Sequence, residues 1–201
     1  MTRLIIATNN LDKLKEIKEI IADPRLTLQS AHDFDDFPEV EETGATLTEN
    51  ALLKARAIWE KYHLPCLADD TGLEVDCLGG RPGVHSSRYA GPQATYAANC
   101  RKLLTEIAGV PASRRGARFR TVIAFIDIQG VEHIAEGTVA GEILVAPRGQ
   151  NGFGYDPVFF VPHLNKTLAE LSPKDKNKIS HRHNALINIL PAINNYLKNE
   201  Y

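Results

Sequence analysis

The sequence has little cysteine and few aromatic residues, and it contains no long hydrophobic run. Its three cysteines form no C-x-x-C pair, and this odd number with no signal-like N-terminus predicts reduced packing thiols in the cytoplasm. No apolar run approaches the roughly 18 residues of a membrane span, which argues against membrane insertion. A formal net charge of −2 provides no broad basic surface for nucleic acid. We therefore expect a small-molecule ligand held by locally clustered cations.

The composition that is present is that of one globular unit. A chain of 201 residues, 43% hydrophobic and 24% charged, can bury roughly 70% of the surface that its unfolded state exposes. No internal repeat, low-complexity tract or composition shift marks a linker. We expect a single domain over residues 1–201.

Hydrophobic periodicity predicts alternating strands and helices. The expected strands cover about 3–8, 64–69, 118–128, 131–146 and 157–161, and the expected helices about 11–22, 46–62, 94–108 and 172–197. The second helix starts with a capping-box pattern at Thr46 and Glu49. The apolar residues that recur at helical spacing along it are Leu47, Ala51, Ala55, Ile58 and Tyr62. Ser172-Pro173 is a good start for the last helix, which Pro191 should kink or break.

Residues 8–13, Thr-Asn-Asn-Leu-Asp-Lys, have the chemistry of a phosphate-binding turn between a strand and a helix. Asn tolerates the left-handed backbone, the helix start adds the positive end of its dipole, and Lys13 adds a full charge. The glycines and the G-K-[ST] ending of a P-loop are absent. Taken alone, the segment also fits an ordinary turn with a solvated lysine.

Two acidic motifs predict a catalytic or metal site. Asp69-Asp70-Thr71-Gly72 follows an apolar strand, at the kind of strand end where α/β folds place their sites. Neighbouring residues on an extended chain point to opposite faces, so one Asp can address a ligand while the other braces the turn. Glu41-Glu42 precedes the helix of Lys54, and a Glu there could share Mg²⁺ with an Asp at 69–70 and a polyphosphate. The alternatives are a plain turn and a solvated acidic loop.

Phe153 lies between Gly152 and Gly154, which add backbone freedom but no packing surface. An aromatic ring on such a backbone favours stacking on a nucleobase. The alternative is a hairpin tip with the ring in the core. The cationic segment 174–183 contains His181 and His183, which are excluded as a zinc pair because residues i and i+2 share no helix face.

Taken together, six motifs resemble the Ham1/inosine triphosphatase family of noncanonical purine nucleoside triphosphate pyrophosphatases over essentially the whole chain. They are Thr8-Asn9-Asn10 with Lys13, Glu41-Glu42-Thr43-Gly44 with Glu49-Asn50-Ala51 and Lys54, Ala68-Asp69-Asp70-Thr71-Gly72-Leu73, Leu78-Gly79-Gly80-Arg81-Pro82-Gly83, Gly152-Phe153-Gly154-Tyr155-Asp156-Pro157 and Ile179-Ser180-His181-Arg182. The chain departs from many relatives at His85, where they carry an aromatic residue before the stretch Ser86-Ser87-Arg88-Tyr89.

The resemblance implies an α/β fold with a mixed central sheet flanked by helices, in two lobes with the active-site cleft between them. It implies hydrolysis of ITP, dITP and XTP to the monophosphate and pyrophosphate, with Mg²⁺ as cofactor. The implied partners are the small-molecule nucleotide and a second copy in a homodimer.

The resemblance also implies roles for particular residues. Asp70 is the proton acceptor and a metal ligand, Glu41 is the second ligand with Glu42 as an open substitute, and Thr71 lies against the substrate. The residues that hold the triphosphate are Thr8, Asn9, Asn10, Leu11, Asp12, Lys13, Lys176 and, close behind, Lys54. Those that hold the base are Phe153, Gly154, Tyr155, Asp156, His181 and Arg182.

Two other functions compete with this interpretation. One is a pyrophosphatase for modified pyrimidine or methylated nucleotides, against which the purine-facing Phe153 and His181-Arg182 motifs argue. The other is a nucleotide sensor without turnover, whose signature would be loss of the acids at Asp70 and Glu41-Glu42. Both acidic motifs are present.

Overall fold

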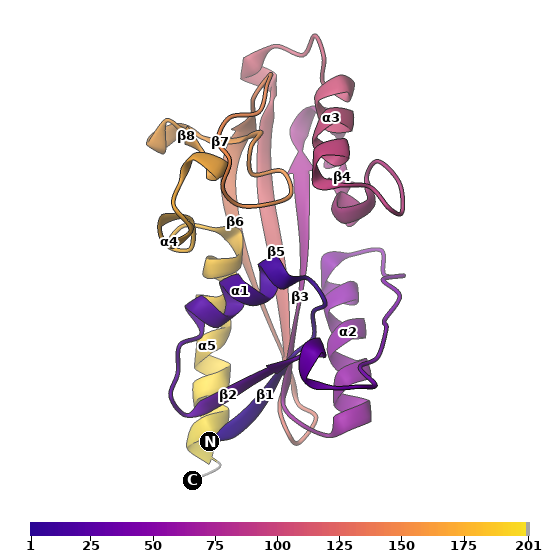
Figure 1. Cartoon of the computed structure of the whole chain (residues 1–201), viewed down its shortest axis with the longest axis vertical. Helices are drawn as coiled ribbons and strands as arrows, with labels where there is room; N and C mark the ends of the chain where they lie inside the picture. The colour runs from indigo at the N-terminus through magenta and orange to yellow at the C-terminus, as the bar shows by residue number, and fades with distance from the viewer. Residues whose placement is uncertain (200–201) are drawn as a thin grey trace. The chain divides into compact units, whose positions relative to one another are not determined.

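A computed structural model describes residues 1–199, and over this part of the chain eight strands form one mixed sheet with flanking helices (Figure 1). The strands are β1 Thr2–Ile6, β2 Leu26–Ser30, β3 Cys66–Val75, β4 Pro82–Gly83, β5 Gly116–Ile126, β6 Glu132–Ile143, β7 Phe159–Val161 and β8 Lys166–Thr167. The α-helices are α1 Leu11–Ile20, α2 Leu47–Tyr62, α3 Tyr96–Glu106, α4 Pro173–Lys176 and α5 His181–Asn199. The predicted fold class, a mixed α/β sheet flanked by helices, is confirmed.

The strand order in the sheet is β2-β1-β3-β5-β6-β7-β8, and β4 pairs with β3 off this path. β1 runs parallel to β2 and to β3, with Ile5 opposite Cys66. β7 runs antiparallel to β6 and β8. In the parallel part, α1 is the crossover between β1 and β2, as parallel strands require.

The chain divides into two compact units built from interleaved segments. The first unit contains Met1–Asp70, Thr121–Gly137 and the described part of His181–Tyr201. The second contains Thr71–Arg120 and Thr138–Ser180. The single domain over 1–201 and the cleft between two lobes stay predictions.

Alternating side chains divide the first unit into two layers around its strands. Leu4 and Ile6 of β1 and Leu67 of β3 share one buried cluster with residues of α1 and α5. On the other face of β3, the thiol of Cys66 donates a hydrogen bond to the carbonyl oxygen of Ala55 in α2, over 3.1 Å. Because neighbouring strand residues face opposite sides, Asp69 should point toward α1 and α5 and Asp70 toward α2.

The helix α2 matches its prediction closely. Its capping box at Thr46 and Glu49 is present, with the Thr46 hydroxyl accepting from the Glu49 amide over 3.1 Å. Of the predicted stripe, Leu47, Ala51, Ala55 and Ile58 are buried, and Tyr62 is half-buried.

The second unit has its own hydrophobic core, in which α3 packs on the rest of β3 and β5. Leu73 and Val75 of β3 and Leu103 of α3 are fully buried. The rings of Phe119 and Phe159 lie 4.7 Å apart between centroids. This core supports the loop from 149 to 158 that carries the predicted base-binding residues.

The strand expected at 64–69 is longer than predicted, and Asp69-Asp70-Thr71-Gly72 is not a turn. β3 continues to Val75 because its later residues also have partners, with Leu73 opposite Gly83 of β4. The two aspartates therefore lie within a strand that is buried on both faces, where no turn is needed.

The helix expected at 172–197 is two helices. Ser172 caps α4 as predicted, but α4 ends at Lys176, and a turn precedes α5 in which the amides of Ile179 and Ser180 bond to the Lys176 carbonyl. α5 continues through Pro191, which was expected to kink or break it. Its apolar face is buried on both sides of the proline, and we attribute the continuity to this packing. None of the helices in residues 1–199 is long and apolar enough to cross a bilayer.

Candidate active site

On the α1 and α5 face of β3, Asp69 is the centre of a buried ion cluster. Its Oδ2 accepts hydrogen bonds from Arg182 Nε and Nη2, over 3.2 and 3.1 Å, and lies 3.2 Å from Lys13 Nζ. Arg182 also donates to the carboxylate of Glu16. Burial alone would raise the pKa of Asp69, but the charges of Lys13, Arg182 and Lys54 lower it well below its ordinary value. Asp69 is therefore a permanent anion.

On the α2 face, Asp70 contacts two polar side chains of α2. Asn50 Nδ2 donates to its Oδ2 and Lys54 Nζ to its Oδ1, both over 3.2 Å. Lys54 Nζ also donates to Glu42 Oε1 over 2.8 Å and to the Asp69 carbonyl over 2.6 Å. Because neighbouring residues of β3 face opposite sides, the two adjacent carboxylates lie on opposite faces of the strand.

Asp70 differs from Asp69 in its affinity for protons. Burial raises the pKa of Asp70, and the nearby charge of Glu42 adds to this, while Lys54 acts in the opposite direction. Burial alone would lower the pKa of Lys54, but the charges of Asp70, Asp69 and Glu42 raise it. Asp70 is therefore a carboxylate with increased basicity beside a lysine that stays charged, which suits a general base.

The turn at residues 8–13 is held by its own side chains. Asn10 caps α1 by accepting from the amides of Asp12 and Lys13, over 2.9 and 3.1 Å, and its own amide donates to Thr8 Oγ1 over 3.2 Å. Those amides thus have acceptors inside the turn. The structure brings the side chain of Lys13 to Asp69, where burial lowers the pKa of Lys13.

Of the two candidate acids at 41–42, Glu42 is the one that reaches this cluster. Glu42 is half-buried against Lys54, whereas Glu41 is exposed and its carbonyl accepts from the Thr43 amide. Within residues 1–199, no three side chains of His, Cys, Asp or Glu gather as a metal cage. The ammonium of Lys54 contacts both Asp70 and Glu42, so the two carboxylates share one cation.

In the second unit, Phe153 lies beside a buried ion pair. Asp156 Oδ2 accepts from the Phe153 amide over 2.9 Å and from Lys176 Nζ over 2.5 Å. Lys176 Nζ also lies 4.4 Å from the centroid of the Phe153 ring. A Cβ at Gly152, whose φ is +70°, would overlap the Asp156 carboxylate, so glycine is required there. The ring is half-buried, which differs from the core position considered as the alternative.

The structure groups several predicted residues differently from the sequence analysis. Lys176, expected with the triphosphate turn, pairs with Asp156 in the second unit. Arg182, expected with the base, pairs with Asp69 in the first unit. The Tyr155 hydroxyl is buried and donates to the Ser86 carbonyl over 2.9 Å.

The remaining predicted residues lie near these groups along the chain. His181 is buried at the start of α5, and Thr71 is half-buried directly after Asp70. Leu11 is 63% exposed at the start of α1.

The sequence assigned no role to Asn50 and Glu16, which bond to Asp70 and Arg182 in the charged cluster. Asn50 is fully buried, and besides donating to Asp70 it accepts from the Gly44 amide over 2.8 Å. Its position one helical turn before Lys54 was the available signal. Glu16 is a buried carboxylate in α1 that binds Arg182, and no local pattern marks it.

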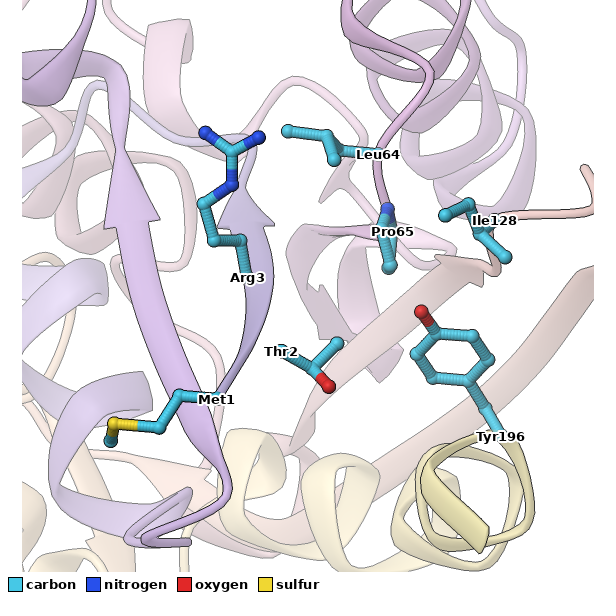
Figure 2. Close-up of a pocket in the computed structure, with 7 residues that line it drawn as sticks. All are labelled: Met1, Thr2, Arg3, Leu64, Pro65, Ile128 and Tyr196. Carbon is cyan, nitrogen blue, oxygen red and sulfur yellow. The ribbon is translucent and has the colours of Figure 1, made fainter. Parts of the chain in front are cut away.

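A separate pocket of the first unit has different chemistry (Figure 2). Its volume is about 360 Å³, and its lining residues are Met1, Thr2, Arg3, Leu64, Pro65, Ile128 and Tyr196. Arg3 is its one charged side chain, and no predicted site residue lines it. The charged cluster around Asp69 and Asp70 is therefore the better candidate for polyphosphate chemistry.

The sequence is similar to that of known proteins along most of its length. The Ham1 family model matches residues 4–192. A dITP/XTP pyrophosphatase of Geobacillus kaustophilus is 49% identical over 92% of this chain and 91% of its own length. That of Bacillus subtilis is 48% identical over 92% of this chain and 94% of its own.

Solved structures give the same result. A HAM1 protein from Coxiella burnetii matches with a TM-score of 0.88 and 42% identity, covering 97% of this chain and 100% of that one. The Staphylococcus aureus Ham1 protein matches with a TM-score of 0.86 and 41% identity, covering 100% of both chains.

Proposed function

The chain belongs to the Ham1 family, and from this premise we propose that it is a pyrophosphatase of noncanonical purine nucleoside triphosphates. It hydrolyses dITP, XTP and ITP to the monophosphate and pyrophosphate, which removes these nucleotides from the pool. The single observation that carries the chemistry is the Asp70 carboxylate, whose pKa is raised by burial next to the charged Lys54.

Asp70 acts as the general base in this reaction. It takes a proton from a water molecule as the water oxygen bonds to the α-phosphorus, and the bond from that phosphorus to the departing pyrophosphate breaks. Asn50 holds the carboxylate from α2 through Oδ2, which fixes the direction of its oxygens. A positioned base of this kind contributes typically about a hundred- to ten-thousandfold in rate.

Cationic side chains of the first unit neutralise the polyphosphate. Lys54 remains an ammonium in contact with Asp70 and Glu42. Lys13 is the last residue of the capped turn 8–13, and its lowered pKa reflects a buried ammonium that an incoming phosphate would stabilise. Phosphoryl transfer needs positioning and charge neutralisation more than covalent help, so these two lysines are suited to it.

We propose that magnesium binds between Asp70 and an acid of the 41–42 pair. Two carboxylates with water and phosphate oxygens match the preference of Mg²⁺, and Asp70 and Glu42 already share the cation of Lys54. Bound there, magnesium would supply charge stabilisation at the phosphate oxygens. Glu42 is thus favoured over Glu41, the ligand that the family resemblance implies.

This choice between the two glutamates is tested by their glutamine variants. Glu42→Gln is expected to raise the magnesium concentration needed for half-maximal activity, while Glu41→Gln, the matched control in the same loop, leaves it near wild type. The reverse order would assign the metal to Glu41.

The base is held in the second unit by Phe153 and the Asp156–Lys176 pair. The ring offers a stacking surface, and the Lys176 ammonium beside it is a donor for a purine 6-keto oxygen. Adenine carries an amine at that position, and a buried donor facing a donor is strongly unfavourable.

We further propose a homodimer that works in the cytoplasm. The free thiols of all three cysteines support a reducing compartment. Light scattering on the purified chain tests the assembly, and a mass of one chain at working concentration would contradict it.

The first experiment measures pyrophosphate release from ITP, XTP, GTP and ATP at equal concentration, with and without magnesium. Magnesium-dependent pyrophosphate from ITP and XTP, with little from GTP and ATP, is the expected result. Orthophosphate as product would overturn the bond assignment, and tight binding without turnover would make the protein a nucleotide sensor.

A further inference from the structure

Two sequence segments to which the proposed function assigns no role meet in the second unit. They are the stretch 78–83 and the stretch 86–89. Together with α3 they form a pocket of about 390 Å³, within the usual range for small-molecule sites. Its lining residues are Arg81, Pro82, His85, Arg88, Tyr89 and Lys102.

The pocket has an excess of positive charge. Its lining contains three basic side chains, Arg81, Arg88 and Lys102, and no Asp or Glu, and Glu106 of α3 lies beside Arg81 and Lys102. Glu106 Oε2 lies 3.4 Å from Arg81 Nη1, and Oε1 lies 3.9 Å from Lys102 Nζ. The lining is therefore basic, in a chain whose net charge is −2.

Glu106 also accepts a hydrogen bond from a residue of the pocket lining. The Tyr89 hydroxyl donates to Glu106 Oε2 over 2.5 Å. Burial, together with this hydrogen bond, raises the pKa of Tyr89 to about 12, so the phenol stays neutral and adds no negative charge. An anion entering the pocket therefore meets no negatively charged group in the lining itself.

Two of the lining residues are buried, and one of the basic side chains is largely exposed. Pro82 and Tyr89 are buried, and Lys102 Nζ donates to the Tyr89 carbonyl over 2.7 Å while lying 4.5 Å from the Tyr89 ring centroid. The Arg81 side chain is 62% exposed. Arg81 and Lys102 both lie beside the Glu106 carboxylate, so a guanidinium and an ammonium are close enough to bind two oxygens of one phosphate group.

We propose that this pocket is a second anion site, for a small molecule that carries a phosphate or diphosphate group. It shares no residue with the Asp70 cluster or with the Phe153 group, and it does not depend on which nucleotide is the substrate. The shared chemistry is the phosphate group, whether it comes from inorganic phosphate, from pyrophosphate or from a nucleoside monophosphate.

The test follows backbone amide signals by NMR while inorganic pyrophosphate is added without metal. A saturable shift of the amides at 83–89 is expected, because these residues surround the pocket. Parallel titrations with inorganic phosphate and with inosine monophosphate identify the source by which of the three binds most tightly. No saturable shift with any of them, or the same shift with chloride at equal ionic strength, would overturn the proposal.

Variants connect this signal to the pocket. Arg81→Gln with Lys102→Gln should weaken the affinity read at 83–89 by roughly tenfold or more, since charge-assisted hydrogen bonds are lost. Arg101→Gln is the matched control, an exposed cation next to Lys102 on α3 that does not line the pocket. Equal affinity in the double variant and the control would refute the site. If the double variant melts early, Arg81→Gln alone gives the same comparison, because its side chain is largely in solvent.

Discussion

Asp69 and Asp70 are neighbours of the same residue type, but the strand places their side chains in different environments. Asp69 faces Lys13 and Arg182, which lower its pKa, whereas Asp70 is buried against α2 with Glu42 nearby, which raises its pKa. An enzyme that needs a permanent anion and a proton acceptor can obtain both from one dipeptide, because consecutive strand residues sample opposite environments.

Asp70→Asn is expected to lose about a hundred- to ten-thousandfold in kcat while the fold survives. The raised pKa means that the fold favours protonated Asp70, and stability falls as pH rises through that pKa, so a neutral amide keeps or raises the melting temperature at pH 7. Activity should also fall on the acid side at a pH above the ordinary Asp value of 3.8. Turnover near wild type would remove Asp70 from the base role.

Asp69→Asn, in contrast, should destabilise the fold. Removing this charge leaves Arg182 and Lys13 buried with less compensation, at a cost of about 3–5 kcal/mol in the free energy of unfolding. The lowered pKa of Asp69 also means that its ionised form stabilises the fold. This stabilisation is present above about pH 3.8 and is lost as the pH falls below it. Urea unfolding at pH 7 measures the loss, and a change under 1 kcal/mol would contradict the ion cluster.

At the level of elements, the close approach of β6 to α5 sets the position of the start of α5. A Cβ at Gly137 would overlap the backbone of Ala185 and the carbonyl of His181. Gly137 therefore allows the helix that carries His181 and Arg182 to lie directly against the strand.

Gly137→Ala is expected to destabilise the fold by about 1–3 kcal/mol or more, because backbone atoms cannot move aside as a flexible side chain does. Thermal melting measures this. Gly109→Ala is a useful comparison, since its φ of +80° strains alanine but no atom lies within 4 Å of its Cβ. A smaller effect at Gly137 than at Gly109 would argue against the close contact.

Sequence patterns predicted the elements whose stability is local and failed where partners distant in sequence decide. The capping box and apolar stripe of α2 follow from its own residues, and both are present. The extension of β3 past Asp70 depends on pairing with β4, and the continuity of α5 through Pro191 depends on the packing of its apolar face. Neither of these is visible in a window of neighbouring residues.

The same reasoning applies to the site. Asp70 and Lys54 are site candidates from the sequence because each belongs to a recognisable motif, and the structure brings the two side chains into contact, while their roles stay predictions. Arg182 could not be placed with Asp69 and Glu16, since that cluster joins α1, β3 and α5. Residue type predicted that these groups are functional, and only the fold defines which of them pair.

At the level of the whole molecule, two compact units divide the proposed labour. The charged groups for the triphosphate belong to the first and the aromatic ring with its ion pair to the second. Three strands, β3, β5 and β6, each contribute residues to both units. Neither unit is therefore a continuous stretch of chain, and neither can be excised as a fragment.

The hydrogen bond from Cys66 to Ala55 joins β3 to α2, so the reactivity of the Cys66 thiol can report separation of these two elements. Burial raises the pKa of Cys66 to about 12 and that of Cys100 to about 11, so a thiol reagent should modify the half-buried Cys77 first. Cys66 is fully buried and its thiol bonds to α2, so we expect its reaction to require separation of α2 from β3, the two elements that carry Lys54 and Asp70. A slow labelling rate at Cys66 that falls further with bound nucleotide would report how often α2 separates from β3.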